Sequence, residues 1–172
     1  MNRAKRFSMI FGLCLLFGGC SAGQQLVSNP GPPSGYQLDE RLEQLQFTGL
    51  DGQPFNLKAY AGRPVFLNFW ASWCAPCISE MGSIAEVFQQ FGGEVAFLAV
   101  STDDLSTIQQ FQEKHSFLFP FAHLEGDYID AFVIKLPTTL LISREGKLLF
   151  EEEGMRIWTT EALRQKVEAI AK

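Results

Sequence analysis

Two cysteines separated by two residues stand in the segment Trp70-Ala-Ser-Trp-Cys-Ala-Pro-Cys77. Such a pair can supply half of a tetrahedral metal site, close a small disulfide loop, or exchange electrons by alternating between dithiol and disulfide. The chain has two further cysteines, Cys14 and Cys20, and both lie within its first 20 residues. The use of the pair therefore depends on whether those two belong to the folded domain.

The start of the chain has the pattern of an export signal. Three basic residues among the first six precede an uncharged apolar run, residues 7–17, which fits the ~7–15 residues of a signal core and not the ~20 that cross a bilayer. Gly-Gly-Cys ends this segment and resembles a bacterial lipobox, so we expect residues 1–19 to be a lipoprotein-type signal peptide and Cys20 to be lipidated. Phe17 departs from that motif, and an ordinary signal peptide in which Cys20 has no role is the alternative.

The remaining chain divides into a tether and one domain. Residues 20–38 are rich in Gly, Gln, Ser, Asn and Pro, which is typical of a flexible tether. Residues 39–172 have the mixed apolar pattern and the length of a single domain, without internal repeats. The chain carries 19 acidic and 14 basic residues, and beyond the signal segment it has no basic cluster, which argues against nucleic acid as a partner.

Apolar patterns within the domain predict an α/β sandwich. Asp51-Gly52 between apolar positions predicts a hairpin, and the continuous apolar runs 65–70 and 95–100 predict strands buried on both faces, each followed by helical periodicity. A second hairpin across residues 138–151 and a final helix complete the pattern. A β-α-β half followed by a β-β-α half gives a mixed central sheet with helices on both faces and an N-terminal β-hairpin extension.

Cys74 is expected at the junction of a buried strand and the first turn of a helix. Unpaired N–H groups and the helix dipole stabilise a thiolate there, which lowers the pKa of Cys74 and favours it as the nucleophile. Cys77, one turn further in, is placed to resolve a mixed disulfide. Trp73 would form an apolar rim beside Cys74, and Pro76 would fix the first helical turn. A disulfide over so short a loop would restrict the unfolded chain little, which makes a purely structural role weak.

The residues expected of a metal site are incomplete. No second cysteine pair remains in the domain, and His115 and His123 lie eight residues apart, outside the usual spacing of paired zinc ligands. We therefore expect no structural metal and no cofactor. Two thiolates can hold Cu(I), so a lipid-anchored copper carrier stays open as an alternative function.

Two segments carry a resemblance to a known family. Val65-Phe-Leu-Asn-Phe-Trp-Ala-Ser-Trp-Cys-Ala-Pro-Cys77 and Leu136-Pro-Thr-Thr-Leu-Leu-Ile142 resemble the thioredoxin superfamily, and in particular its membrane-tethered extracytoplasmic TlpA/ResA/CcmG-type thiol:disulfide oxidoreductases. The resemblance implies a thioredoxin-like three-layer sandwich and a redox disulfide between Cys74 and Cys77. It also implies that Pro137 is a cis-proline facing the disulfide, and that clients contact Trp73, Ala75, Pro76 and Leu136.

Two polar positions bear on proton transfer. Thioredoxins proper carry a buried acid where this chain has Asn68, which cannot titrate. Glu80 matches a glutamate that TlpA/ResA-type proteins often carry near the sulfurs, and it lies one helical turn after Cys77. Burial would raise the pKa of Glu80 and let it exchange a proton with Cys77. A solvated helix carboxylate without a catalytic role is the alternative.

The resemblance also implies a biological setting. The expected activity is exchange of the Cys74–Cys77 pair with client protein disulfides on the periplasmic face, usually as a reductant, for example in cytochrome c maturation. The expected partners are a membrane electron donor of the thiol-reducing type and the membrane itself through a lipid anchor. Ala75-Pro76 does not set the direction of electron flow. A thioredoxin-fold peroxidase is a further alternative, although Ala71 stands where peroxiredoxins have threonine.

Overall fold

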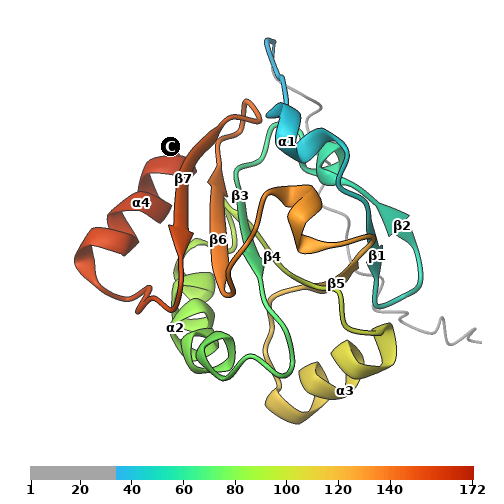
Figure 1. Ribbon diagram of the computed structural model, residues 1–172. Helices are drawn as coiled ribbons and strands as arrows, with labels where there is room; N and C mark the ends of the chain where they lie inside the picture. The colour runs from blue at the N-terminus through green and yellow to red at the C-terminus, as the bar shows by residue number, and fades with distance from the viewer. Residues whose placement is uncertain (1–33) are drawn as a thin grey trace, which may run out of the picture.

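The structure is a computed structural model that describes residues 34–172, and its elements are drawn in Figure 1. The expected signal peptide, Cys20 and the tether up to residue 33 lie outside the described residues. The elements follow along the chain as α1 (Glu40–Glu43), β1 (Phe47–Gly49), β2 (Pro54–Phe55), the 3₁₀ turn η1 (Leu57–Tyr60), β3 (Val65–Phe69), α2 (Ala75–Phe91), β4 (Ala96–Ser101), α3 (Leu105–His115), β5 (Phe121–Leu124), the 3₁₀ turn η2 (Tyr128–Ala131), β6 (Thr138–Ile142), β7 (Leu148–Glu153) and α4 (Glu161–Ala171).

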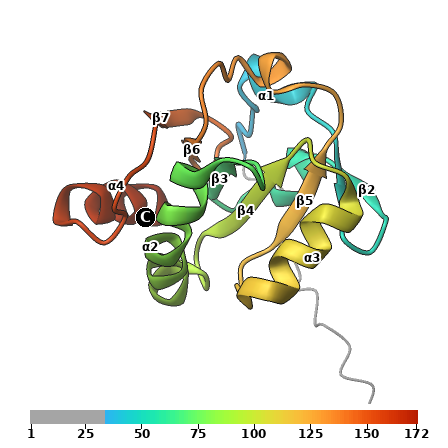
Figure 2. The same ribbon diagram turned by 60° about the horizontal axis from the view of Figure 1, so that its bottom comes forward.

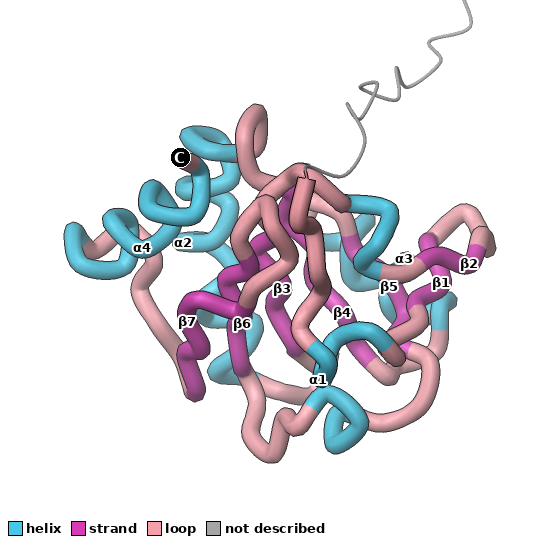
Figure 3. Tube along the Cα trace, turned by 90° about the horizontal axis from the view of Figure 1, so that it is seen from above, coloured by secondary structure: helices cyan, strands magenta, loops and turns pink. Residues whose placement is uncertain are grey.

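The strands form one mixed sheet in the order β2-β1-β5-β4-β3-β6-β7, which can be followed across Figure 3. The central strand β3 runs parallel to β4 and antiparallel to β6. Every residue of β3, β4 and β6 is buried, which explains their continuous apolar sequences. The predicted hairpin is confirmed as β1 and β2, and it joins the sheet through the antiparallel pair β1–β5.

Alternate residues of β3 feed two separate cores. Phe66, and Trp70 directly after the strand, belong to the core beneath α2, α3 and α4. Val65, Leu67 and Phe69 belong to the core covered by α1, η1 and η2. Figure 2 shows the three longer helices on one face of the sheet, with α1 on the other. The predicted sandwich with a mixed sheet and helices on both faces is therefore confirmed.

The structure adds features that the sequence patterns did not show. Strand β5 lies between β4 and β1 and connects the N-terminal hairpin to the main sheet. Its four residues follow Pro120 and include the half-buried His123, which makes the apolar run too short to recognise. Leu38, the last residue of the expected tether, is buried in the second core. None of the helices within residues 34–172 is both long and apolar enough to cross a membrane.

Candidate active site

The first turn of α2 is built directly onto the end of β3. The N–H of Trp70 donates to the carbonyl of Val100 at 3.0 Å, which keeps the chain paired to β4 until it turns. Cys74 is the N-cap of α2, and its Sγ accepts the backbone N–H of Cys77 at 3.3 Å. Pro76 stands in the first helical turn, as expected, where no backbone hydrogen is needed. A negative charge on Cys74 Sγ is thus stabilised by an N–H donor and by the helix dipole.

Cys74 and Cys77 form a disulfide, with their Cα atoms 5.2 Å apart. The two cysteines differ in their access to solvent. Cys74 is 6% exposed and lines an open groove, whereas Cys77 is fully buried and does not line it. This difference fits the predicted roles of Cys74 as the attacking sulfur and Cys77 as the resolving one.

An apolar groove of about 740 Å³ opens beside Cys74. Its lining includes two large apolar side chains that are exposed, Trp73 and Ile134. The peptide bond between Leu136 and Pro137 is cis, as the resemblance implied, and the carbonyl of Pro137 accepts the N–H of Gly154 at 2.7 Å. That Pro137 faces the sulfurs remains a prediction. The groove is lined by Trp73, Cys74, Ala75, Pro76, Asp127, Tyr128, Ile129, Val133, Ile134, Lys135 and Leu136.

Two side chains that the sequence did not single out hold the segment before Cys74. Asp103 accepts the N–H of Ser72 at 2.7 Å, and the hydroxyl of Tyr128 donates to the carbonyl of Trp70 at 2.6 Å. Asp103 could have been found, because it follows β4 and the carboxyl ends of parallel neighbours meet at one edge of a sheet. Tyr128 comes from the 3₁₀ turn η2, and no local pattern marks it.

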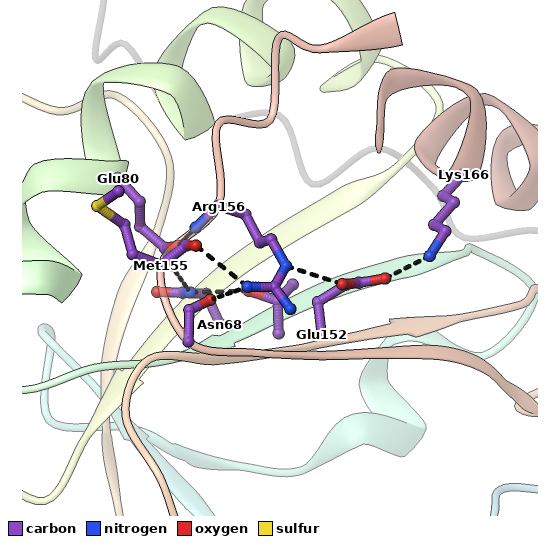
Figure 4. A network of polar contacts seen from close by, with 8 residues as sticks. Asn68, Glu80, Glu152, Met155, Arg156 and Lys166 are labelled. Atoms are coloured by element: carbon purple, nitrogen blue, oxygen red, sulfur yellow. Dashed lines mark hydrogen bonds and ion pairs between the residues drawn. The ribbon is translucent and has the colours of Figure 1, made fainter. Parts of the chain in front are cut away.

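Glu80 is buried, only 2% exposed, so the alternative of a solvated carboxylate is wrong. Its Oε1 accepts from Asn68 Nδ2 at 2.8 Å and its Oε2 accepts the backbone N–H of Arg156 at 2.9 Å, as drawn in Figure 4. Burial raises the pKa of Glu80 to about 7, and the two hydrogen bonds and the Arg156 charge offset only part of that rise. A carboxyl that gains and loses its proton near neutral pH therefore lies one helical turn after Cys77.

Asn68 links Glu80 to the neighbouring strand. Its Nδ2 also donates to Thr139 Oγ1 at 2.9 Å, and the two residues stand directly opposite each other in the β3–β6 register. Asn68 Oδ1 has no hydrogen-bond partner among the described residues. The amide can thus rotate and present its oxygen instead when the group at position 80 donates a proton.

The two histidines have other neighbours. His123 Nδ1 lies 2.9 Å from the carbonyl oxygen of Asp103, and the His115 ring stacks on Phe117. Within residues 34–172, no group of three or more His, Cys, Asp or Glu side chains is placed to hold a metal ion.

Comparisons with known proteins identify relatives of this chain. Residues 39–150 match the model of the AhpC/TSA family. Thiol-disulfide oxidoreductase ResA of Halalkalibacterium halodurans is 34% identical over 159 residues, which cover 90% of each chain. ResA of Bacillus thuringiensis is 36% identical over 112 residues, and that alignment covers 62% of this chain and 64% of the relative, less than two thirds of its length.

Solved structures agree on the fold. A Chlorobium tepidum protein designated thiol:disulfide interchange protein DsbE is 28% identical, with a TM-score of 0.67 over 74% of this chain and 92% of that one. Further neighbours are a thioredoxin-family thiol:disulfide interchange protein from Chlorobium tepidum, 21% identical, and MTB dsbF, 25% identical, each with a TM-score of 0.63. The thioredoxin-like class that the sequence predicted is therefore confirmed.

The buried Glu80 predicts a specific pH dependence of stability. Between pH 4.5, its ordinary value, and about 7, the folded protein holds one proton more than the unfolded chain, so the free energy of unfolding falls as the pH rises. The shift corresponds to about 3 kcal/mol. We expect Glu80→Gln to remove most of this fall, measured by urea unfolding of the oxidised protein at pH 5 and pH 8. The unpaired Asn68 Oδ1 can accept from the new amide.

Glu86→Gln is the matched control, because Glu86 lies exposed on the same helix. It should leave the difference between pH 5 and pH 8 in place. An equal difference in the wild type and in Glu80→Gln would contradict the account of Glu80.

Proposed function

Since the chain belongs to the AhpC/TSA family and is related to thiol-disulfide oxidoreductases of the ResA type, we propose that it exchanges its Cys74–Cys77 pair with disulfides of client proteins. One observation carries this proposal. Cys74 caps a helix and lines an open groove, while its partner Cys77 is buried at disulfide distance. This arrangement presents one nucleophilic sulfur to another protein and keeps the second in reserve.

The reaction proceeds by two successive attacks. In the reduced protein, the Cys74 thiolate attacks one sulfur of a client disulfide, and the other client sulfur leaves as a thiolate. The Cys77 thiolate then attacks Cys74 Sγ and releases the second client sulfur. The client gains two electrons and the Cys74–Cys77 disulfide forms. Cys77 must lose its proton before its attack, and Glu80 is the buried carboxyl placed to accept it.

The proposed cellular location and partners rest on the family resemblance and on the export signal expected in residues 1–19. The TlpA/ResA/CcmG-type pattern favours a reducing role outside the cytoplasm, with clients such as apocytochrome c. A membrane electron donor of the thiol-reducing type then returns the pair to the dithiol. The lipobox-like sequence supports a lipid anchor at Cys20, with the tether holding the domain away from the membrane surface.

The groove suggests how clients bind. Its walls present Trp73 and Ile134, 73% and 81% exposed, and Leu136 lies between the groove and the core. Large apolar side chains exposed together mark an interaction site more often than chance. We therefore assign the groove to an apolar client segment that flanks the attacked disulfide, with Ala75 and Pro76 as the adjoining contacts.

Removal of the resolving cysteine should trap the reaction intermediate. In Cys77→Ala the resolving sulfur is missing, so clients should accumulate as mixed disulfides through Cys74, visible on non-reducing gels and identified by mass spectrometry. Cys74→Ala, which keeps the buried sulfur, should trap none. Absence of any Cys74-linked adduct in Cys77→Ala would sink the exchange mechanism.

Trapping of clients by Cys77→Ala also tests whether the groove binds them. Ile134→Asp in the Cys77→Ala background should reduce the protein adducts several-fold without slowing the reaction of Cys74 with a small aromatic disulfide, because only the apolar contact is lost. Leu118→Asp is the control, since Leu118 is 78% exposed and does not line the groove. Equal adduct yields from the two variants would remove the groove from client binding.

A separate prediction concerns the anchor. Cys20→Ser should move the full-length chain from the membrane fraction to the soluble fraction and abolish incorporation of labelled fatty acid, because the thioether site is gone. Cys14→Ser is the control and should retain both properties. A wild-type chain that takes up no label would refute the lipoprotein assignment and leave the thiol chemistry untouched.

A further inference from the structure

Arg156, in the loop after β7, joins two acidic side chains. Its backbone N–H donates to Glu80 Oε2 at 2.9 Å, and its side-chain Nε donates to Glu152 Oε2, also at 2.9 Å. The second oxygen of Glu152 pairs with Lys166 Nζ. Figure 4 shows the resulting line of polar groups from Glu80 through Arg156 and Glu152 to Lys166.

Glu152 is the fixed point of this line. Its side chain is 13% exposed, whereas the side chains of Arg156 and Lys166 are 36% and 35% exposed. Burial raises the pKa of Glu152, but hydrogen bonds and charge from Lys166 and Arg156 outweigh it, so the net direction is down and Glu152 stays ionised. A partly buried carboxylate between two cations restrains their positions more than an exposed ion pair does.

We propose that Arg156 is a positioning residue for the redox pair, held in place by Glu152 and Lys166 and acting on Cys77 through Glu80. Its backbone N–H holds one oxygen of the Glu80 carboxyl, and its guanidinium is a positive charge that acts on that carboxyl. The effect on the sulfurs rests on the proposed function, but the contact with Glu80 does not.

The groups around Glu80 determine the sign of the effect. Strands β3 and β6 contribute Asn68 and Thr139, which are neutral, and its own helix contributes the two cysteines, which are bonded to each other here. The loop contributes Arg156 and the Trp158 indole. Trp158 lowers the pKa of Glu80 slightly, although its Nε1 has no partner within hydrogen-bonding distance among the described residues.

Further out lie Glu152 on β7 and Lys166 on α4, with opposite charges. Arg156 lowers the pKa of Glu80 through both its N–H and its charge, against the larger rise from burial. Loss of the guanidinium must therefore move the titration of Glu80 to higher pH.

The test is a ¹³C NMR titration of the Glu80 carboxyl in the oxidised full-length chain, with its signal assigned by its loss in Glu80→Gln. Arg156→Met keeps the backbone N–H and removes the charge, so the midpoint should rise by about half a pH unit or more. Arg156→Lys retains the charge and should restore most of the wild-type midpoint. Arg164→Met removes an arginine of α4 that pairs with Glu161 instead, and it should leave the midpoint unchanged.

The same variants give a readout at the sulfurs. The pH dependence with which the reduced pair reacts with a small disulfide should shift in Arg156→Met, and the shift should vanish in the Glu80→Gln background. Lys166→Met keeps an apolar side chain against Phe150 and should shift the Glu80 midpoint in the same direction as Arg156→Met, but by less. This variant replaces Arg156→Met in the titration if Arg156→Met does not fold.

An unmoved or lowered midpoint in the folded variants would overturn the proposal. The titration uses the oxidised protein and needs no client. A failure of client trapping would therefore reject the proposed function and leave the role of Arg156 standing. An unmoved Glu80 midpoint would reject the role of Arg156 and leave the proposed function standing.

Discussion

The structure depends most on the junction at which the buried strand β3 becomes the helix α2. β3 is enclosed on both faces and paired on both edges, so its end has a fixed position. Five residues separate the end of that strand from the first residue of the helix, and Cys74 at the N-cap accepts the free N–H of Cys77. The difference between the sulfurs follows from this placement, because Cys74 at the cap still lines the groove whereas Cys77 inside the first turn is fully buried.

The site stabilises negative charge at one position and disfavours it at another. The N-terminus of α2 favours a thiolate at Cys74, whereas the low polarity around Glu80 favours a neutral carboxyl. The protein limits the cost of burying Glu80 by giving each of its oxygens one donor, from Asn68 and from the Arg156 backbone. The result is a proton acceptor near neutrality one helical turn after Cys77 and an apolar groove beside Cys74, which suits exchange with another protein.

The sequence predicted the parts of the site that depend on local patterns. The spacing of Cys74 and Cys77, the apolar run before them and the helical periodicity after them are properties of adjacent residues. The cis bond before Pro137 came from the resemblance. Burial of Glu80 could not be decided in this way, because Glu80 is covered by Asn68 and by a loop that returns 76 residues later.

Other contacts also join residues that are separated in the sequence. Tyr128 reaches Trp70 from η2, 58 residues later, and Lys166 reaches Glu152 from α4, 14 residues later. Polar residues in loops show no periodic pattern in the sequence, so their hydrogen-bond partners can be identified only when the strand order of the sheet is known. The short strand β5 was missed for a related reason, since four residues after a proline give too little pattern to identify.

The central claim is that the two sulfurs are unequal, with Cys74 the accessible thiolate and Cys77 the protected resolving group. The most direct measurement is pulsed alkylation of the fully reduced wild-type protein near neutral pH, with a limiting amount of iodoacetamide and mass spectrometry of the peptides. The account predicts modification at Cys74 well before Cys77, with the preference lost on unfolding in urea. Equal labelling of both cysteines in the folded protein, or earlier labelling of Cys77, would contradict it.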